Sequence, residues 1–304
     1  MDVETVMSWR PIRVHFPPKA PNVRAALDNS TRMLFVRDPY NRVFSAYVDK
    51  LISPNPYYWK EWGKKAILNY RKSWSNANSS HDTCGQDVTF GEFMSWVLSA
   101  GWMKDSHMIP ISRHCTPCTL NYTVVGKMET FLRDAQLVFD SLAVNSSQLD
   151  FQQMGEDAAF DAILDSTKDS MSADWLKSTL NCVSKRDVVK RIVRKLQIRG
   201  IISWRFRMSE DRMDNIGVDG LVGVLSESRD LYASSRGELK VQKRQAYLEA
   251  LRKLTKGQMD AMKAVYSQDF QLFGYDVTPA VLSRTEVNTD AFDLSKDWDL
   301  SPVL

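Results

Sequence analysis

The residues best suited to chemistry lie in one segment, MLFVRDPYNRVFSAYVDK, which runs from Met33 to Lys50. Its first four residues, MLFV, are apolar and predict a short buried strand that ends at Arg37. Asp38 is a preferred N-cap residue and Pro39 is preferred at the first helical position, so we expect a helix over 39–51. The turn would therefore place the positive end of a helix beside a permanently charged guanidinium.

The expected helix carries a polar stripe that could bind an anion. Asp38, Arg42, Ser45 and Asp49 recur at helical spacing, and the other side of the helix is apolar and would pack on a sheet. The stripe and Arg37 together offer guanidinium and hydroxyl donors, which are the groups that hold phosphate. Ligands of open α/β sheets bind at the carboxyl ends of strands, where this turn would lie. The residue types alone leave two interpretations open, phosphate binding and a solvated helix face.

The elements needed to position this segment indicate an α/β protein. We expect strands at 33–36 and 122–125, the second ended by Gly126. Expected helices lie at 39–51, 88–99 (with Thr89 as N-cap and a Thr89–Glu92 capping box), 128–142, 187–199 and 239–266, the last with a break near Gly257. Three stretches lack a clear pattern and are predicted to be an irregular lead-in, a surface linker and a polar segment: 1–30, 53–80 and 145–180. Strand–helix alternation predicts a parallel sheet flanked by helices.

Length and composition limit the class of protein. The chain has 304 residues and 43% hydrophobic content, which suits one large domain or two modest ones with a sizeable core. It contains no apolar run of about 18 residues, the length that would span a membrane. The net charge of +3 says little about partners, but residues 185–207 hold nine Lys/Arg and a single acid, Asp187. This stretch could bind an anionic glycan or a nucleic acid, and we favour a solvated helix face.

The four cysteines indicate an oxidising compartment. An even, small number is typical of disulfides, and four cysteines allow three connectivities: Cys84, Cys115, Cys118 and Cys182. The alternative is a zinc site, because His107 and His114 lie close to the C-x-x-C pair. A second ligand pair at suitable spacing is missing, so we favour two disulfides over zinc.

Three segments resemble the Golgi carbohydrate sulfotransferases, a group that includes chondroitin, dermatan and N-acetylgalactosamine 4-O-sulfotransferases. FVRDPYNRVFSAYVDK fits nearly every position of the family pattern F-V-R-[DE]-P-[FY]-x-R-x-x-S-A-Y-x-[DN]-K. DSHMIPISRHCTPCTLNYTVVGKMETFLRDA is similar to the family segment that runs D-P-H-W, C-x-P-C and Y-D-F-V-G-K-x-E-T, and MKAVYSQDFQLFGYDV is similar to Y-x-x-D-F-x-x-F-x-Y. The resemblance implies a sulfotransferase domain over 31–276, weakly matched at 145–240 and followed by a loose acidic tail at 277–304.

The resemblance implies a P-loop-like fold and transfer of a sulfonate from 3′-phosphoadenosine 5′-phosphosulfate (PAPS) to a glycan hydroxyl, without a metal. By the family pattern, Arg37 and Ser45 hold the 3′-phosphate of PAPS. Asp38 and Pro39 shape the turn, and Arg42 supports it. A dianionic phosphate needs positive charge together with directed donors, and this turn offers both. The resemblance therefore favours phosphate binding over a solvated face, with a glycan or proteoglycan rather than a nucleic acid as the partner.

His107 is the candidate general base, because it matches the histidine of D-P-H-W and an imidazole accepts protons near neutral pH. Ser106 and Met108 stand where the family has Pro and Trp, and a structural histidine that fixes the loop is the alternative. Glu129 in GKMET also matches the family, but we favour a carboxylate that interacts with a helix start.

The family also has an upstream loop for the 5′-phosphosulfate, whose lysine stabilises charge on the leaving phosphate. No such loop is recognisable, since Lys19 lies close to Arg37 without neighbouring glycines. We therefore expect an incomplete chain, whose full-length form is a type II membrane glycoprotein of the Golgi lumen with an N-terminal anchor. Four N-x-S/T sequons agree with a lumenal location: Asn29, Asn78, Asn121 and Asn145. A catalytically inactive glycan-binding homologue is the alternative, and a polyanion- or nucleic-acid-binding module is a weaker one.

Overall fold

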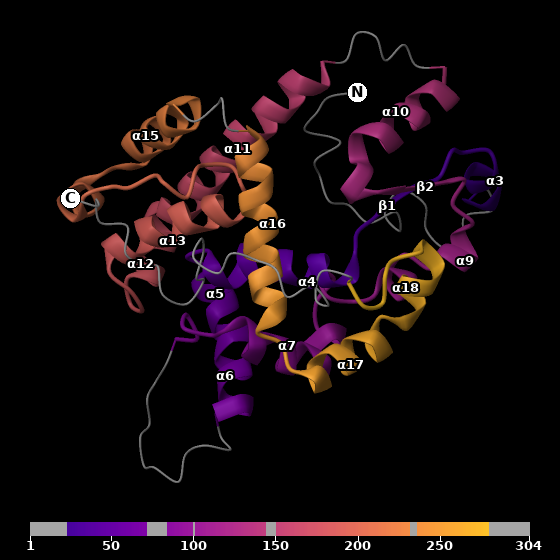
Figure 1. Ribbon diagram of the computed structural model, residues 1–304, viewed down its shortest axis with the longest axis horizontal. Coiled ribbons are helices and arrows are strands. Elements are labelled where there is room, and N and C mark those ends of the chain that lie inside the picture. The colour runs from indigo at the N-terminus through magenta and orange to yellow at the C-terminus, as the bar shows by residue number, and fades with distance from the viewer. Residues whose placement is uncertain (1–22, 72–83, 100, 144–149, 232–235, 280–304) are drawn as a thin grey trace. The chain divides into compact units, whose positions relative to one another are not determined.

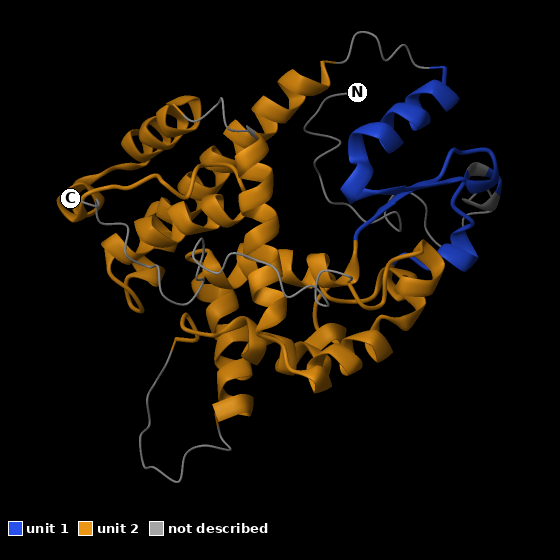
Figure 2. Ribbon diagram, in the orientation of Figure 1, with its two compact units in different colours: residues 1–37, 115–146 blue, residues 38–114, 147–304 orange. Residues whose placement is uncertain are grey.

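The computed structural model describes residues 23–71, 84–99, 101–143, 150–231 and 236–279 (Figure 1). The chain divides into two compact units (Figure 2): unit 1 comprises 1–37 and 115–146, and unit 2 comprises 38–114 and 147–304. Most of the predicted lead-in, including Lys19, and the predicted acidic tail from residue 280 lie outside the described residues, and the predicted domain boundaries stay predictions. Among the described helices, none has the length and apolar character needed to cross a membrane.

Unit 1 contains a parallel sheet. Strand β1 (Met33–Val36) pairs with β2 (Val124–Lys127), and the register places Phe35 opposite Gly126. The strand predicted at 33–36 is confirmed, and the second strand is shifted two residues toward the C-terminus. Gly126 lies inside β2 and does not end it. The Phe35 ring packs against this glycine and would lie 2.6 Å from a Cβ at the position. A larger residue at 126 would therefore displace this ring.

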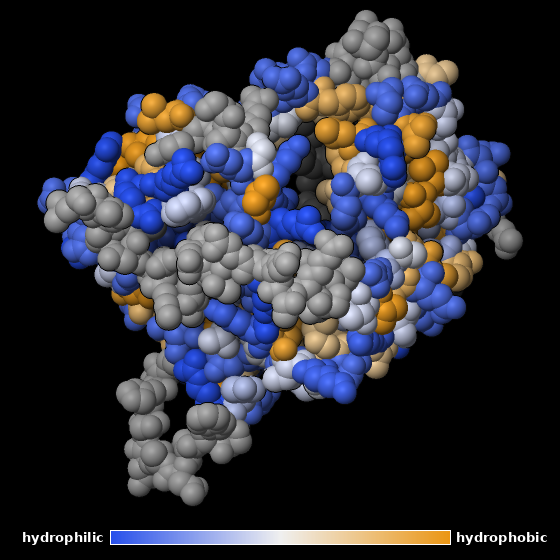
Figure 3. Space-filling view, in the orientation of Figure 1, coloured by the Kyte–Doolittle hydropathy of each residue, from blue (hydrophilic) through white to orange (hydrophobic). Residues whose placement is uncertain are grey.

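Helices accompany the sheet within unit 1. A short helix, α3 (Val23–Asp28), occupies part of the stretch predicted to be irregular, and α9 (Pro117–Leu120) precedes β2. The 3₁₀ turn η4 (Met128–Thr130) leads into α10 (Phe131–Ser141), which packs on β2, so the helix predicted over 128–142 is confirmed. Glu129 lies in the first turn of this run. In the region of α10, Figure 3 shows hydrophobic residues (orange) beside hydrophilic ones (blue). Leu137 on this helix is 62% exposed. The α/β class with a small parallel sheet is thus as predicted.

Unit 2 is helical, and its first apolar core surrounds α4 (Pro39–Tyr47). The helical run continues through the π-helical turn η1 (Val48–Ile52), which confirms the helix predicted over 39–51. This core also includes residues of α7 (Phe90–Ser99), α16 (Arg236–Arg252), α17 (Lys256–Val265) and α18 (Ser267–Phe273), among others. The predicted capping box is present before α7, since Glu92 N donates to Thr89 Oγ1 (3.2 Å) and Thr89 N donates to Glu92 Oε2 (2.8 Å). The break predicted near Gly257 lies instead at 253–255, and Gly257 is inside α17.

The segment 53–80, predicted to be a surface linker, is largely helical and partly buried as far as residue 71. It forms α5 (Pro56–Tyr58), the π-helical turn η2 (Trp59–Gly63) and α6 (Lys64–Arg71), and residues 72–83 lie outside the described part. Trp59 and Trp62 belong to the first core, where Trp62 stacks on Phe93 with ring centroids 5.8 Å apart. The prediction was wrong because Trp59 and Trp62 are core residues, whereas Tyr57 and Tyr70 are 60% and 45% exposed.

A second core in unit 2 joins α11 (Phe151–Met171), α13 (Lys185–Ile198), α14 (Glu210–Asn215) and α15 (Val218–Leu231), and α12 (Ala173–Thr179) follows α11. The stretch 145–180, predicted to be poorly patterned, thus holds a helix of 21 residues. Asp150 caps this helix, because its carboxylate accepts hydrogen bonds from the amides of Gln152 and Gln153. Three of its six buried residues carry hydroxyl groups: Ser166, Thr167 and Ser170. The apolar periodicity of this helix is therefore weak in the sequence.

The basic helix α13 confirms the prediction over 187–199, and its apolar residues are fully buried: Val188, Ile192 and Leu196. The expectation that its basic residues form a solvated face is wrong for Arg191, Arg194 and Lys195, which are 8%, 5% and 8% exposed. Lys195 Nζ pairs with Asp49 at 2.8 Å. On the exposed side, Arg186 forms ion pairs with α14 residues Glu210 and Asp214. These basic side chains therefore serve contacts within the protein.

Arg191 joins three segments of unit 2. Its guanidinium donates to the carbonyl oxygens of Leu51 (3.3 Å), Ile52 (3.2 Å) and Gln86 (2.8 Å), and it lies 4.8 Å from the centre of the Trp59 ring. Burial lowers the pKa of Arg191 to about 10, so the side chain remains charged at pH 7. The desolvated charge is compensated by carbonyl dipoles and by the indole face.

We expect Arg191→Met to lower the free energy of unfolding by about 2–3 kcal/mol, because buried carbonyl groups lose their hydrogen-bond donor. Removal of the buried charge offsets part of this loss. Urea denaturation followed by tryptophan fluorescence measures this change. Arg186→Met on the same helix is the control, and its loss should stay below about 1 kcal/mol because its partners are exposed. Equal losses in the two variants would show that the buried contacts of Arg191 do not matter for stability.

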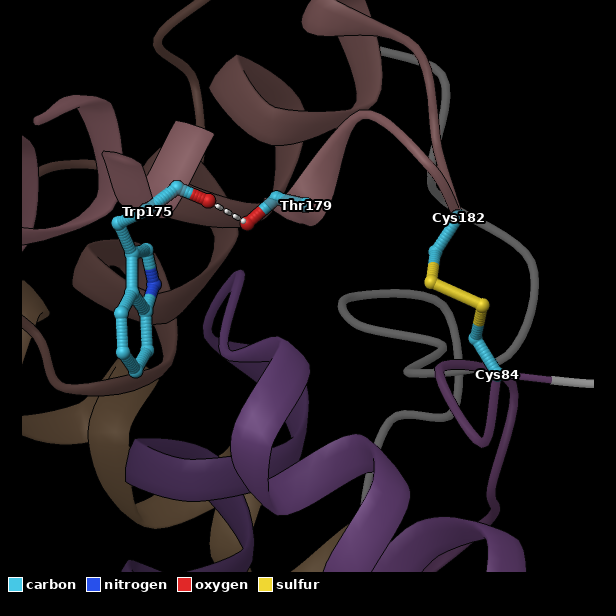
Figure 4. Close-up of a disulfide and its surroundings, with 4 residues drawn as sticks. All are labelled: Cys84, Trp175, Thr179 and Cys182. Carbon is cyan, nitrogen blue, oxygen red and sulfur yellow. Dashed lines mark hydrogen bonds between the residues drawn. A yellow bond between two sulfur atoms is a disulfide. The ribbon is translucent and has the colours of Figure 1, made fainter. Parts of the chain in front are cut away.

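A disulfide links two segments of unit 2 that are distant in sequence. Cys84, before α7, is bonded to Cys182, between α12 and α13, with Cα atoms 5.9 Å apart (Figure 4). Neither Cys115 nor Cys118 is disulfide-bonded in the described part of the chain, so one of the two predicted disulfides forms and the other does not. The bonded cysteines are 98 residues apart in sequence, and the bond therefore closes a long loop.

Candidate functional site

The start of α4 has the predicted cap. Asp38 accepts a hydrogen bond from Asn41 N (2.9 Å) through its side chain, and Pro39 occupies the first helical position. Tyr247 Oη on α16 donates to the same carboxylate oxygen at 3.2 Å, which ties the cap to the first core. The first amides of α4 are largely unavailable to an anion. Pro39 has no N–H, and the N–H of Asn41 is already bonded to Asp38. A phosphate here would depend on side-chain donors.

Ser45 lies on the half-buried side of α4, six residues after Pro39 and thus about 9 Å along the helix axis. Its neighbours Phe44 and Ala46 are buried in the first core. No hydrogen bond between the described residues engages the Ser45 hydroxyl. Arg37 belongs to unit 1 and Asp38 opens unit 2, so the structure describes these residues in separate units. The pairing of Arg37 with Ser45 on one phosphate therefore stays a prediction.

Arg42 holds the loop that carries His107. Its Nη1 donates to Ile109 O (2.5 Å) and its Nη2 donates to Ser106 O (2.6 Å), one on each side of the histidine. Two directed hydrogen bonds from a planar guanidinium fix the orientation of a loop more firmly than one would. Arg42 therefore connects α4, in the segment FVRDPYNRVFSAYVDK, to the loop that carries His107.

The C-terminal segment MKAVYSQDFQLFGYDV also binds the loop that carries His107. Tyr266 Oη donates to Met108 O at 2.6 Å. Asp269, which is 1% exposed, accepts hydrogen bonds from the amides of Ile111 (2.7 Å) and Ser112 (2.8 Å), where the short helix α8 (Ile111–His114) begins. A buried carboxylate that accepts backbone N–H bonds at a helix start is stabilised by the helix dipole. The Y-x-x-D spacing of the C-terminal segment is thus explained by its contacts with the histidine loop.

His107 is paired with a carboxylate that the sequence analysis missed. Its Nδ1 lies 2.5 Å from Asp105 Oδ1, and the His107 amide donates to the same oxygen at 2.9 Å. The His107 ring makes edge contacts with Tyr58 and Trp62, with centroids 6.5 and 6.2 Å away. The imidazole is 43% exposed, so its other nitrogen can reach a substrate. The signal in the sequence was the D-x-H spacing of DSH, in which only the histidine was given a role.

The geometry supports proton transfer rather than metal binding at this loop. When Asp105 accepts the Nδ1–H of His107, Nε2 is left as a proton acceptor, which is the arrangement of an oriented general base. Among the described residues, no group of three or more His, Cys, Asp or Glu side chains is placed to hold a metal ion.

Comparison with known proteins identifies the family. A model described as "Sulfotransferase family" matches residues 12–202. Carbohydrate sulfotransferase 8 of Homo sapiens is 39% identical over 111 residues, which are 36% of this chain and 26% of the relative. Carbohydrate sulfotransferase 9 of Homo sapiens is 40% identical over 111 residues (36% and 24%), and carbohydrate sulfotransferase 14 of Mus musculus is 30% identical over 142 residues (46% and 36%).

The matched region thus spans about a quarter to a third of the length of these relatives. No solved structure shows a significant match to the chain. The family model covers more than half of the 304 residues, and the segments that it matches include the α4 turn and the histidine loop. On this basis, the chain belongs to the sulfotransferase family.

Proposed function

We propose that this protein transfers a sulfonate group from PAPS to a hydroxyl of a glycan. Membership of the sulfotransferase family supports group transfer, and the relatives are carbohydrate sulfotransferases by name. The observation that carries the proposal is the convergence of the motif segments within unit 2. Arg42 from the first segment, and Tyr266 and Asp269 from the third, all bind the loop that presents His107.

The residues around α4 fit a nucleotide phosphate. Ser45 offers a hydroxyl on the half-buried side of the helix, and Arg37 immediately precedes the helix cap in sequence. A guanidinium and a hydroxyl can supply directed donors and a compensating charge to a phosphate. When bound, PAPS supplies an activated sulfonate whose leaving group is a phosphate. In the proposal, Arg37 and Ser45 hold the 3′-phosphate, Asp38 and Pro39 shape the turn, and Arg42 positions the histidine loop.

The His107–Asp105 pair would handle the proton of the reaction. As the acceptor oxygen bonds to sulfur and the bond between sulfur and the phosphate oxygen breaks, the hydroxyl proton moves to Nε2 of His107. The Asp105 carboxylate keeps the Nδ1–H in place and stabilises the imidazolium that forms. The proton then leaves to solvent, because the ring is exposed.

Arg37→Ala and Ser45→Ala should each abolish retention of the protein on an adenosine 3′,5′-bisphosphate column, because each removes a donor from the phosphate. The loss expected from a charge-assisted hydrogen bond is roughly tenfold or more in affinity. Calorimetric titration with adenosine 3′,5′-bisphosphate gives the same comparison as a dissociation constant. Thermal unfolding should be close to that of the wild type.

Arg212→Ala and Ser178→Ala are matched controls, since both side chains are exposed and lie outside the three segments. They should be retained like the wild type. If Arg37→Ala and Ser45→Ala are retained as well, the phosphate assignment is wrong.

Transfer must also be distinguished from binding alone, because the loop for the 5′-phosphosulfate was not recognised in the sequence. Incubation with PAPS and an acceptor glycan should release adenosine 3′,5′-bisphosphate in amounts equal to the sulfonated product. A protein that binds the nucleotide and the glycan but releases none is the inactive homologue.

The proposed location is the Golgi lumen, with a glycan or proteoglycan as partner. The Cys84–Cys182 disulfide supports an oxidising compartment. The type II membrane anchor stays a prediction.

A further inference from the structure

Two aromatic rings flank the imidazole of His107. The Tyr58 ring is inclined at 85° to the imidazole with centroids 6.5 Å apart, and the Trp62 ring is inclined at 69° with centroids 6.2 Å apart. Both are edge-to-face arrangements, at centroid distances that favour aromatic pairs. Since Tyr58 and Trp62 also contact each other, with centroids 4.3 Å apart, they form a continuous aromatic wall beside the histidine.

The contact with Asp105 fixes only one atom of the imidazole. It engages Nδ1, and the ring is 43% exposed. A ring that is held at a single atom can still turn about its side-chain bonds, and such a turn would also move Nε2. A general base must stay within hydrogen-bond reach of the proton that it accepts, and a misplacement of about 1 Å can lower a rate roughly 100-fold. Contacts that confine the imidazole therefore matter for the proposed reaction.

The two rings of the aromatic wall are held in different ways. Trp62 is 4% exposed and stacks on Phe93, so the first core fixes its position. Tyr58 is half-buried at the end of α5, which has three residues, and its neighbour Tyr57 is exposed. Within the described part of the chain, no hydrogen bond engages the Tyr58 hydroxyl. The position of the Tyr58 side chain therefore depends on the groups that pack against its ring.

Lys50 on η1 is one of the groups that hold this ring. Its Nζ lies over the Tyr58 ring, 5.1 Å from the ring centre, a distance at which an ammonium is attracted to an aromatic face. The Lys50 side chain is 19% exposed, so the contact is partly shielded from water. Such an attraction is stronger when the cation has lost part of its hydration. Lys50 therefore helps to fix the Tyr58 ring next to His107.

The ammonium of Lys50 is in turn held by an ion pair that reaches α13. Asp49 binds Lys50 through Oδ2 (2.9 Å) and the buried Lys195 through Oδ1 (2.8 Å). Burial by itself raises the pKa of the Asp49 carboxyl, but the two ammonium groups outweigh burial and hold this pKa well below its ordinary value. Asp49 is therefore ionised at neutral pH. A chain of contacts thus leads from α13 to the imidazole: Lys195, Asp49, Lys50, Tyr58 and His107.

The Tyr58 hydroxyl does not compete with His107 as a base. Burial raises the pKa of this hydroxyl, and the negative charge of Asp105 raises it further. The phenol therefore stays protonated at neutral pH, where an imidazole can accept a proton. The contribution of Tyr58 to proton transfer is thus expected from its ring, which contacts the imidazole.

We propose that Tyr58 is a positioning residue for His107 and that Lys50 keeps the Tyr58 ring in place. The ring confines the imidazole to the orientation in which Nδ1 faces Asp105 and Nε2 is left for the acceptor hydroxyl. Neither Tyr58 nor Lys50 contacts the reacting atoms, and both act through His107. This inference rests on the proposed function, in which His107 is the general base.

The test compares single and double variants of the 304-residue chain, with kcat measured as release of adenosine 3′,5′-bisphosphate at saturating PAPS and acceptor glycan. Tyr58→Ala should lower kcat about 10- to 100-fold, while acceptor KM and the affinity for adenosine 3′,5′-bisphosphate change less than about twofold. Tyr58→Phe keeps the ring and should retain at least about a third of the wild-type kcat. In the His107→Ala background, Tyr58→Ala should cost less than about twofold, because the residue through which it acts is absent.

Lys50→Met should lower kcat about three- to tenfold, and Lys50→Arg should restore it, because a guanidinium can make both the ion pair and the ring contact. Tyr57→Ala and Lys60→Met are matched controls, since both side chains are exposed and the contacts of Lys50 and Tyr58 with their partners remain. Both controls should have the wild-type kcat. The inference is overturned by a wild-type kcat in Tyr58→Ala, by an effect of Tyr58→Ala on acceptor KM alone, or by an equal loss of kcat in the His107→Ala background.

The tautomer of His107 gives a second measurement that does not depend on transfer. In nuclear magnetic resonance spectra of protein with isotopically labelled histidine, at alkaline pH, the wild type should show mainly the Nδ1–H tautomer, because Asp105 accepts that proton. Tyr58→Ala should populate both tautomers, whereas Tyr58→Phe and Tyr57→Ala should resemble the wild type. If the wild type transfers no sulfonate but the tautomers change in this way, the proposed function fails and the positioning role stands. If transfer occurs and Tyr58→Ala changes neither kcat nor the tautomer, only the positioning role fails.

Discussion

Replacement of His107 by alanine is expected to lower kcat for sulfonate transfer by about 100- to 10,000-fold, the usual contribution of a general base. The loss should appear in kcat at saturating PAPS, because His107 is proposed to act on the acceptor proton and not on the nucleotide. The affinity for adenosine 3′,5′-bisphosphate should therefore be that of the wild type. Release of adenosine 3′,5′-bisphosphate with a saturating acceptor glycan measures kcat, and calorimetry measures the affinity.

Asp105→Asn separates a catalytic role of the histidine from a structural one. The amide keeps the size of the side chain but removes the charge that stabilises the imidazolium, so kcat should fall, though less than in His107→Ala. His114→Ala is the control, since His114 is exposed at the end of α8 and does not share the Asp105 contact. It should retain full activity.

A structural histidine makes different predictions for the same variants. If His107 only fixed the loop, its loss would lower the melting temperature, and acceptor KM would rise along with any change in kcat. A His107→Ala variant with a wild-type kcat would exclude the general-base role. The loop has other supports, because Arg42, Tyr266 and Asp269 bind its backbone directly, so we expect its conformation to survive the change.

The fold could be predicted from the sequence where local signals act alone. The strand at 33–36, the Asp38–Pro39 helix start and the Thr89–Glu92 capping box depend on neighbouring residues, and all are present. The helix over 151–171 could not be predicted by apolar periodicity, because hydroxyl residues take half of its buried positions. The indoles of Trp59 and Trp62 were misassigned for a related reason, since only tertiary packing shows that they are core residues.

The site shows the same division between local and long-range information. The sequence identified His107 and Arg42, but it could not show that they are connected, because the contact joins residues more than 60 positions apart. The charge run at 185–207 predicted a solvated face, whereas the carbonyls that bind Arg191 come from segments about 100 or more residues away. Charge patterns give the number of basic groups, and only the fold gives their partners. The phosphate role of Arg37 and Ser45 still needs the nucleotide-binding experiment.

The second large effect is expected from the disulfide. Cys84→Ala/Cys182→Ala should lower the free energy of unfolding by about 4–5 kcal/mol, the loop-closure value for a loop of roughly 100 residues. Cys84 and Cys182 are 98 residues apart in sequence, which sets the size of this loop. Urea denaturation followed by tryptophan fluorescence measures the change, and the wild type under reducing conditions should show the same loss. Cys115→Ala/Cys118→Ala is the control, because neither cysteine takes part in the Cys84–Cys182 bond, and its change should stay within about 0.5 kcal/mol.

The disulfide and Arg191 restrain the same short segment, and this makes the prediction sharper. Cys84 is bonded to Cys182, and Gln86, two residues later, binds the Arg191 guanidinium. Once the disulfide is absent, this segment can move and Gln86 can meet water, so Arg191→Met should cost less in the Cys84→Ala/Cys182→Ala background than in the wild type. Coupling of at least about 0.5 kcal/mol is typical of residues that share a structural element. Strictly additive losses would mean that the two restraints act on independent parts of unit 2, and the disulfide would then stabilise the fold only through the unfolded chain.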